Sequence, residues 1–320
     1  MQVNEPFVKK IKYIRFFSLF LKVFIFVISV YIILSMLSGK KEWYEEIYQA
    51  YATRSGVLLC IVMFGMMMMN IGLEAWKWKR LVHSIEPIPF ASSLMAVFSG
   101  IYAGLLTPHS IGDYVGRILF VQNGKRLESI GSVLFSRLSQ LLITCMTGIA
   151  AACYFLWNIE MDQRVFILLI LSIITIVLFY IGWHYKTMLL DKMKSIPVLN
   201  KIEFWFEHIR TYSTTLFYET LALSGLRYTI FLTQFVCLLV FFEIDLPVTI
   251  LVIGVIFTFF VKSVVPTLLD LGVRELAAVI FFSQFGIAQE PVILASLSLW
   301  FFNLILPSCI GLFCMFKIER

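Results

Sequence analysis

The chain has 320 residues, of which 60% are hydrophobic and 14% are charged, with a formal net charge of +6. Soluble domains carry about 25% charged residues, so the composition excludes an ordinary soluble protein and predicts an integral membrane protein. Segments of about ten residues with alternating polarity do not recur in the sequence, which argues against a transmembrane barrel and favours an all-α polytopic fold.

Apolar segments long enough to cross a bilayer as helices recur along the chain. The first follows a basic N-terminus, is too long for a signal peptide and lacks a small-residue cleavage site, so we expect it to remain as a helix. The predicted full transmembrane helices are six, at about 16–38, 56–73, 131–157, 165–183, 214–242 and 291–315. We treat residues 1–320 as a single transmembrane domain.

Two pairs of shorter apolar segments lie between these spans. They are 90–106 with 111–123, and 247–264 with 273–285. Pro108 and Gly112 break the first pair, and Pro266 and Gly272 break the second. Proline removes a backbone donor, and glycine tolerates a tight reversal.

Gly112 and Gly272 are half a chain length apart. The chain therefore divides into halves at about 16–157 and 165–315, each with two spans, a broken pair and a third span. This order predicts an inverted-topology repeat whose broken helices meet near the bilayer midplane. The alternatives are two unrelated loops, or short segments that span fully.

Lysine and arginine cluster at both termini, after the second span and in a polar connector at about 185–215. This distribution places both termini in the cytoplasm, and the connector is typical of an amphipathic segment on the membrane surface. Each broken pair adds an even number of membrane crossings whether it is re-entrant or spans fully. The distribution of lysine and arginine therefore does not distinguish the two arrangements. The segment EAWKWKRLV from Glu74 resembles an interfacial anchor, with Trp76 and Trp78 at headgroup level and Lys77 and Lys79 toward phosphates.

Ionisable residues within the apolar regions mark substrate or ion pathways. Five are cationic and three are acidic: Arg117, Arg137, Arg227, Lys262, Arg274, Asp113, Asp270 and Glu275. Arginine grips phosphate with a bidentate fork, and the half-helices after each break aim their positive N-terminal ends inward. The predicted substrate-binding residues are Gly112, Asp113, Arg117, Arg137, Gly272, Arg274 and Glu275. The competing interpretation is structural ion pairing or snorkelling.

Other features carry less information. His109 and Asp270 are candidates for proton coupling, whereas His109 with Asp113 supplies too few ligands for a metal site. Glycines at four-residue steps, from Gly100 to Gly116, indicate close helix packing. The six cysteines lie mostly in apolar runs and suggest packing residues. We find no nucleotide loop, nucleophile elbow or zinc motif, so we expect no cofactor, no nucleic-acid partner and no enzymatic activity.

Several short motifs resemble the lysylphosphatidylglycerol synthase transmembrane family, also called the flippase-like domain. They are AWKWKRLV, PHSIGDYVGR, FSRLSQ, LGVRELAAVIFF and FFNLILPSCIGL. The resemblance implies a bacterial-type inner-membrane protein that moves lipids or lipid-linked sugars between leaflets. Asp113 stands where the family more often has glutamate. Because the sequence ends at Arg320, we expect neither the soluble synthase domain of bifunctional members nor lysyl transfer.

The leading hypothesis is a translocase that moves an anionic phospholipid or polyprenyl-phosphate-linked lipid through a central cationic cavity. The alternative is an integral membrane transferase acting on a lipid-linked substrate, which would need an acidic cluster that the sequence does not show. A non-transporting scaffold would have little use for intramembrane arginines. The sequence is compatible with an oligomer.

Overall fold

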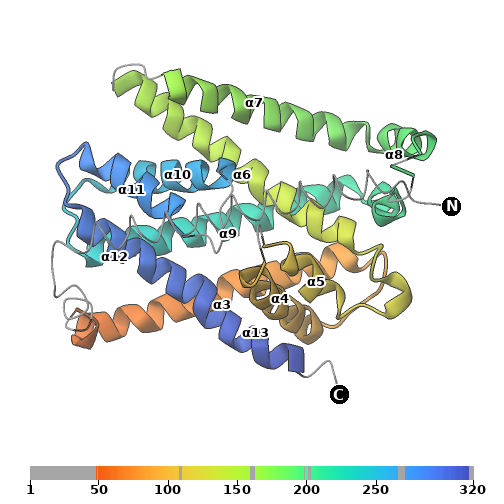
Figure 1. The fold of residues 1–320 in the computed structure, drawn as a ribbon, viewed down its shortest axis with the longest axis horizontal. Coiled ribbons are helices and arrows are strands. Elements are labelled where there is room, and N and C mark those ends of the chain that lie inside the picture. The colour runs from red at the N-terminus through yellow and green to blue at the C-terminus, as the bar shows by residue number, and fades with distance from the viewer. Residues whose placement is uncertain are drawn as a thin grey trace, which may run out of the picture.

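The computed structural model describes residues 48, 50–107, 110–158, 163–197, 199–200, 203–265 and 271–316. Within these ranges the fold is all-helical, as predicted, and contains no strand (Figure 1). The predicted first span lies outside the described residues. So do His109, Asp270 and the two prolines of the breaks, Pro108 and Pro266.

The helices follow the predicted apolar segments closely. They are α3 (Arg54–Val82), α4 (Phe90–Leu105), α5 (Gly112–Ile118), α6 (Ile130–Asn158), α7 (Gln163–His184), α8 (Lys186–Ser195), α9 (Thr214–Phe241), α10 (Val248–Val264), α11 (Val273–Ser283), α12 (Gln289–Trp300) and α13 (Leu306–Phe316). A π-helical turn, η5 (Phe301–Ile305), joins α12 to α13, and short 3₁₀ turns are η2 (Asn123–Lys125), η3 (Glu203–Trp205) and η4 (Glu207–Thr211).

Four helices in the described part of the chain are long and apolar enough to cross a membrane: Arg54–Val82, Ile130–Ala151, Thr214–Phe241 and Gln289–Met315. A bent pair, α7 with α8, turns by 82° and would supply a fifth. These helices confirm a multi-pass, all-α membrane architecture. The number of crossings and the inverted repeat stay predictions.

The two short pairs are present as helices. Helices α4 and α10 have 16 and 17 residues, and their partners α5 and α11 have 7 and 11. Each is shorter than the roughly 20 residues that a full crossing requires. Figure 1 shows α4 and α5 toward the end of the bundle where α3 ends and α6 begins, and α10 and α11 toward the opposite end.

Glycines permit the close contact between α4 and α5. A Cβ atom on Gly112 would lie 2.0 Å from the carbonyl oxygen of Ala103, and one on Gly116 would lie 2.5 Å from that of Ser99. On Gly100 it would lie 2.2 Å from Asp113 Oδ1. The predicted packing role of these glycines is therefore confirmed, and α5 is held with its charged side chains against α4.

The polar connector packs on the ends of α3 and α6. Tyr212 donates a 2.8 Å hydrogen bond to the carbonyl of Leu81, and Ser132 Oγ lies 2.8 Å from the Tyr212 hydroxyl and 2.9 Å from His208 Nε2. Burial lowers the pKa of His208 to about 4 and raises that of Tyr212. His208 is therefore neutral in this contact at neutral pH.

Candidate functional site: a cationic cavity

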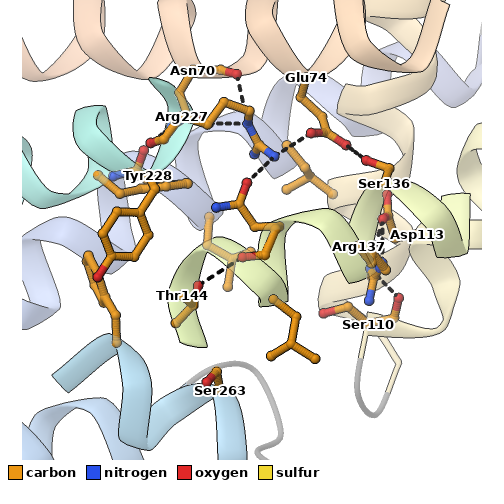
Figure 2. Close-up of a pocket in the computed structure, with 18 of the residues that line it drawn as sticks. Asn70, Glu74, Ser110, Asp113, Ser136, Arg137, Thr144, Arg227, Tyr228 and Ser263 are labelled. Atoms are coloured by element: carbon orange, nitrogen blue, oxygen red, sulfur yellow. Dashed lines mark hydrogen bonds and ion pairs between the residues drawn. The ribbon is translucent and has the colours of Figure 1, made fainter. Parts of the chain in front are cut away.

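A cavity of about 590 Å³ lies among α3, α4, α5, α6, α9, α10, α11 and the α12–η5 segment. Its lining combines apolar side chains, including Ile71, Leu141 and Phe231, with a concentration of charge. The charged lining residues described are six cations and two carboxylates: Lys77, Arg117, Arg137, Arg227, Lys262, Arg274, Glu74 and Asp113. Figure 2 shows the polar part of this wall.

Glu74 is the centre of the charge cluster. Its carboxylate is 3% exposed and lies 2.5 Å from Arg117 Nη1 and 2.9 Å from Lys77 Nζ. Glu74 also pairs with Arg227 Nη1 and accepts a 3.1 Å hydrogen bond from Ser136 Oγ. One buried carboxylate thus holds three cations from α3, α5 and α9. Such an arrangement is tolerable in low dielectric because each charge is paired and hydrogen-bonded.

Asp113 forms the second anionic centre, on α5. Its Oδ1 accepts a 2.6 Å bond from Arg117 Nε, and its Oδ2 accepts bonds of 2.8 and 3.1 Å from Arg137 Nη2 and Nε. Arg137 also donates to the carbonyl of Ser110 and lies with its guanidinium 5.0 Å from the ring centroid of Tyr114. Arg117 therefore bridges the two carboxylates, and Arg137 extends from α6 to Ser110 and Asp113 at the start of α5.

Amide side chains orient Arg227, the third cation of the Glu74 cluster. Asn70 Oδ1 accepts a 2.9 Å bond from Arg227 Nε, and Asn70 Nδ2 donates to the Arg227 carbonyl. Gln140 Oε1 lies 3.4 Å from Arg227 Nη1. Figure 2 shows Arg227 between Asn70 and Glu74, with Arg137 and Asp113 beside Ser110 at some distance along the same wall.

A separate ion pair positions Arg274 at the second break. Its guanidinium lies 2.6 Å from Glu275 Oε1 and donates to both the hydroxyl and the carbonyl of Ser296. The other Glu275 oxygen accepts a 2.7 Å bond from the backbone N–H of Gly272. Gly272 has φ of +93°, a conformation that only glycine adopts without strain. Glu275 thus fixes the turn and Arg274 together.

The π-helical turn η5 interrupts the last long helix beside the cavity. Trp300, Asn303 and Leu304 line the cavity at this turn. Such bulges insert an extra residue into a helix and often occur at functional sites. Here the bulge places the amide side chain of Asn303 in the cavity wall.

Of the predicted substrate-binding residues, Asp113, Arg117, Arg137 and Arg274 line the cavity. The other three are not among the lining residues: Gly112 packs against α4, and Gly272 and Glu275 are hydrogen-bonded to each other, with Glu275 paired to Arg274. The predicted coupling residues His109 and Asp270 lie outside the described residues. Arg227 and Lys262, which the sequence indicated as intramembrane charges, are also in the lining.

Sequence reasoning missed Glu74 and Lys77 because it assigned their segment to the membrane interface. Lys77 is 1% exposed and Trp78 is fully buried, so the anchor interpretation was wrong for both. Only Trp76 and Lys79 fit it: Trp76 is 45% exposed, and Lys79 Nζ lies 5.4 Å from its ring centroid. The missed signal was helical spacing, since Asn70, Glu74 and Lys77 share one face of α3.

A family model described as the lysylphosphatidylglycerol synthase TM region matches residues 19–311. The chain belongs to this family. The match includes every charged residue of the cavity lining, so the resemblance read from the short motifs is confirmed. Membership in the lysylphosphatidylglycerol synthase TM family indicates a multi-pass membrane protein with a lipid-related function. No curated protein and no solved structure gives a significant match to the chain.

Proposed function

We propose that this protein moves an anionic lipid, either a phospholipid or a polyprenyl-phosphate-linked lipid, between leaflets through the cationic cavity. The observation that carries the proposal is the lining of the 590 Å³ cavity, in which six described cations and two carboxylates are enclosed by apolar helices. A phosphate anion complements such an excess of positive charge.

The physical requirement is to lower the cost of bringing a charged headgroup into the membrane. An isolated ion in a low-dielectric medium costs several kcal/mol even after relaxation. Fixed guanidinium groups offset this cost because they replace water with oriented N–H donors. The family match, which indicates a lipid-related membrane protein, supports a lipid as the molecule carried.

Arg137 is the residue we propose for first contact with the phosphate. Its side chain is 33% exposed, compared with 7% for Arg117, 16% for Arg227 and 1% for Lys77. The more deeply buried cations hold the carboxylates in place. Arg137 also lines the cavity, where its guanidinium contacts Asp113 and the carbonyl of Ser110.

Arg117 and Arg274 are less suited to a functional test than the sequence suggested. Both are predicted substrate-binding residues, so Arg117→Ala and Arg274→Ala would be the obvious variants to test. Both residues are almost fully buried against carboxylates, and removing one partner of a buried pair costs about 3–5 kcal/mol. Loss of transport in those variants would not separate binding from folding.

We further propose a transporter rather than an enzyme, in a bacterial-type inner membrane with both termini in the cytoplasm. The basic residues at the ends and in the connector support this orientation. The rival, a membrane transferase, would alter the headgroup and not merely move it. His109 and Asp270 stay candidates for coupling lipid movement to proton transfer.

The test is a translocation assay with purified protein in phosphatidylcholine vesicles. Fluorescent phosphatidylglycerol is placed in both leaflets, and a membrane-impermeant quencher then bleaches the accessible fraction. We expect wild-type protein to make nearly all the probe accessible and Arg137→Gln to slow this by roughly tenfold or more, the ratio for one lost charge-assisted hydrogen bond. No acceleration over protein-free vesicles would reject the proposal, and a chemically changed headgroup would favour the transferase.

A further inference from the structure

A second cavity, of about 430 Å³, lies between α6 and α7. Its wall is apolar except for Thr175 and Lys186, and its residues are Phe135, Leu138, Leu141, Leu142, Thr175, Leu178, Phe179, Gly182, Trp183, Lys186 and Ile209. Figure 1 shows α7 at the edge of the bundle, diverging from α6 toward the α8 end. We refer to this cavity as the α6–α7 slot.

The slot and the cationic cavity share part of one helix. Leu138 and Leu141 line both cavities, and they lie one turn apart on the same face of α6. Leu138 keeps 37% of its surface exposed, so it is only partly covered by the rest of the protein. Arg137, the proposed phosphate contact, is its neighbour in the sequence. A charged compartment and an apolar one therefore adjoin across two leucine side chains.

We infer that the α6–α7 slot holds a hydrocarbon chain of the same lipid molecule whose phosphate occupies the cationic cavity. The inference rests on the proposed function and specifies its substrate as an amphiphile bound across α6. The slot's volume falls in the range of about 300–1,000 Å³ that is usual for ligand sites. Its apolar wall suits an acyl or polyprenyl chain, whereas the adjoining arginines suit a phosphate.

A rival placement uses Lys186 at the α8 end of the slot. Its Nζ donates to the carbonyl of Tyr212 and lies 4.0 Å from the ring centroid of Trp183. A lipid with its phosphate on Lys186 would be a separate bound lipid and not the transported one. The single cation at Lys186, compared with six in the adjoining cavity, favours the central placement.

The test uses phosphatidylglycerol with a photoreactive diazirine in one acyl chain, diluted into phosphatidylcholine vesicles that contain the purified protein. We expect cross-links on Leu142, Thr175 and Phe179 of the slot. Arg137→Gln should lower slot labelling by roughly tenfold, as for one lost charge-assisted contact. Labelling of Ile170 and Ile173, which are exposed on α7, should not change and reports ordinary bilayer contact.

Two further variants separate filling of the slot from general damage. A Cβ on Gly182 meets no atom within 4 Å, so Gly182→Leu should be accommodated and should occupy the slot. Gly65→Leu is the matched control, since Gly65 is exposed on α3, also has open space and lines neither cavity. We expect Gly182→Leu, and not Gly65→Leu, to reduce both slot labelling and lipid movement severalfold.

The outcomes distinguish this inference from the proposed function. Slot labelling that responds to Lys186→Gln and not to Arg137→Gln would overturn the inference, as would labelling that matches Ile170 in all variants. Either result could accompany full lipid movement, in which case the translocase proposal survives. Labelling that depends on Arg137, in a protein that moves no lipid, would support the bound amphiphile and reject translocation.

Discussion

Glu74 on α3 and Arg117 on α5 form a buried ion pair, with 2.5 Å between Glu74 Oε1 and Arg117 Nη1, although 43 positions separate them in the chain. The pair joins a long helix to the short half-helix that follows the first break. Arg117 also pairs with Asp113. The charge cluster therefore depends on Glu74, which is distant in the sequence from both Arg117 and Asp113. The geometry of the cavity wall is therefore set from α3.

We predict that Glu74→Gln destabilises the protein strongly. The substitution removes the counter-ion of Lys77, Arg117 and Arg227, and breaking a buried pair costs about 3–5 kcal/mol. The control is Glu219→Gln, whose partner Arg80 is 44% exposed and whose loss should cost under about 1 kcal/mol. Denaturant unfolding in detergent measures both, and equal effects would contradict a structural role for Glu74.

Gly112→Ala should also destabilise, for a steric reason. Its new methyl group would lie 2.0 Å from the Ala103 carbonyl oxygen, and such overpacking costs about 1–3 kcal/mol. Gly65→Ala, where the added atom meets nothing within 4 Å, should be neutral or stabilising by up to about 1 kcal/mol. Thermal unfolding of the two variants compares them directly. An unchanged Gly112→Ala protein that loses only lipid binding would restore Gly112 as a substrate contact.

The predicted topology can be tested by cysteine accessibility in a cysteine-free background. We expect Gly124→Cys in the η2 turn to react from the cytoplasmic side and Glu243→Cys after α9 from the opposite side, with both termini cytoplasmic. Ser110→Cys in the first break should react slowly with a membrane-impermeant reagent, because the break lies at membrane depth in the inverted-repeat hypothesis. Reaction of Ser110→Cys as rapid as that of the loop positions would exclude re-entry.

Acidification should weaken the contact between the connector and the ends of α3 and α6. The pKa of His208 is about 4 in the fold and about 6.5 when unfolded, so between these values the unfolded chain binds more protons. The stability from neutral His208 is complete above pH 6.5 and is lost as pH falls toward 4, by at most about 3 kcal/mol. The melting temperature measured over this window should fall less in His208→Gln. If the melting temperatures of wild type and His208→Gln fell equally with pH, His208 would not be the group responsible.

The preference for anionic over zwitterionic lipid should persist at high ionic strength. Buried charges are screened much less than surface charges, and Lys77, which the sequence placed at the interface, belongs to the buried group. Lipid competition followed by native mass spectrometry at low and high salt measures the preference. Lys79→Gln should weaken only its low-salt component, whereas Arg137→Gln should weaken it at both. A preference that disappears entirely with salt would place the lipid on the surface.

The sequence predicted the helices well because their signal is local. The span expected at 214–242 is α9 at Thr214–Phe241, and the segment expected at 247–264 is α10 at Val248–Val264. Hydrophobic length and the flanking prolines and glycines are sufficient for such bounds. Helix α5 ends earlier than the predicted residue 123, at Ile118, because the remaining apolar residues continue as turns.

By itself, the sequence determined an all-helical, multi-pass membrane protein with arginines and carboxylates at its two breaks, since burial of charge in apolar segments is visible in one dimension. Only the tertiary structure decided which charges meet. Asp113 pairs with Arg117 one turn away and with Arg137 on another helix, while Glu74 joins them from a segment that resembled an interfacial anchor. The physical reason is that the energy of an ion pair depends on distances of a few ångströms between side chains. Helix packing sets those distances, through contacts such as that of Gly116 on α5 with Ser99 on α4.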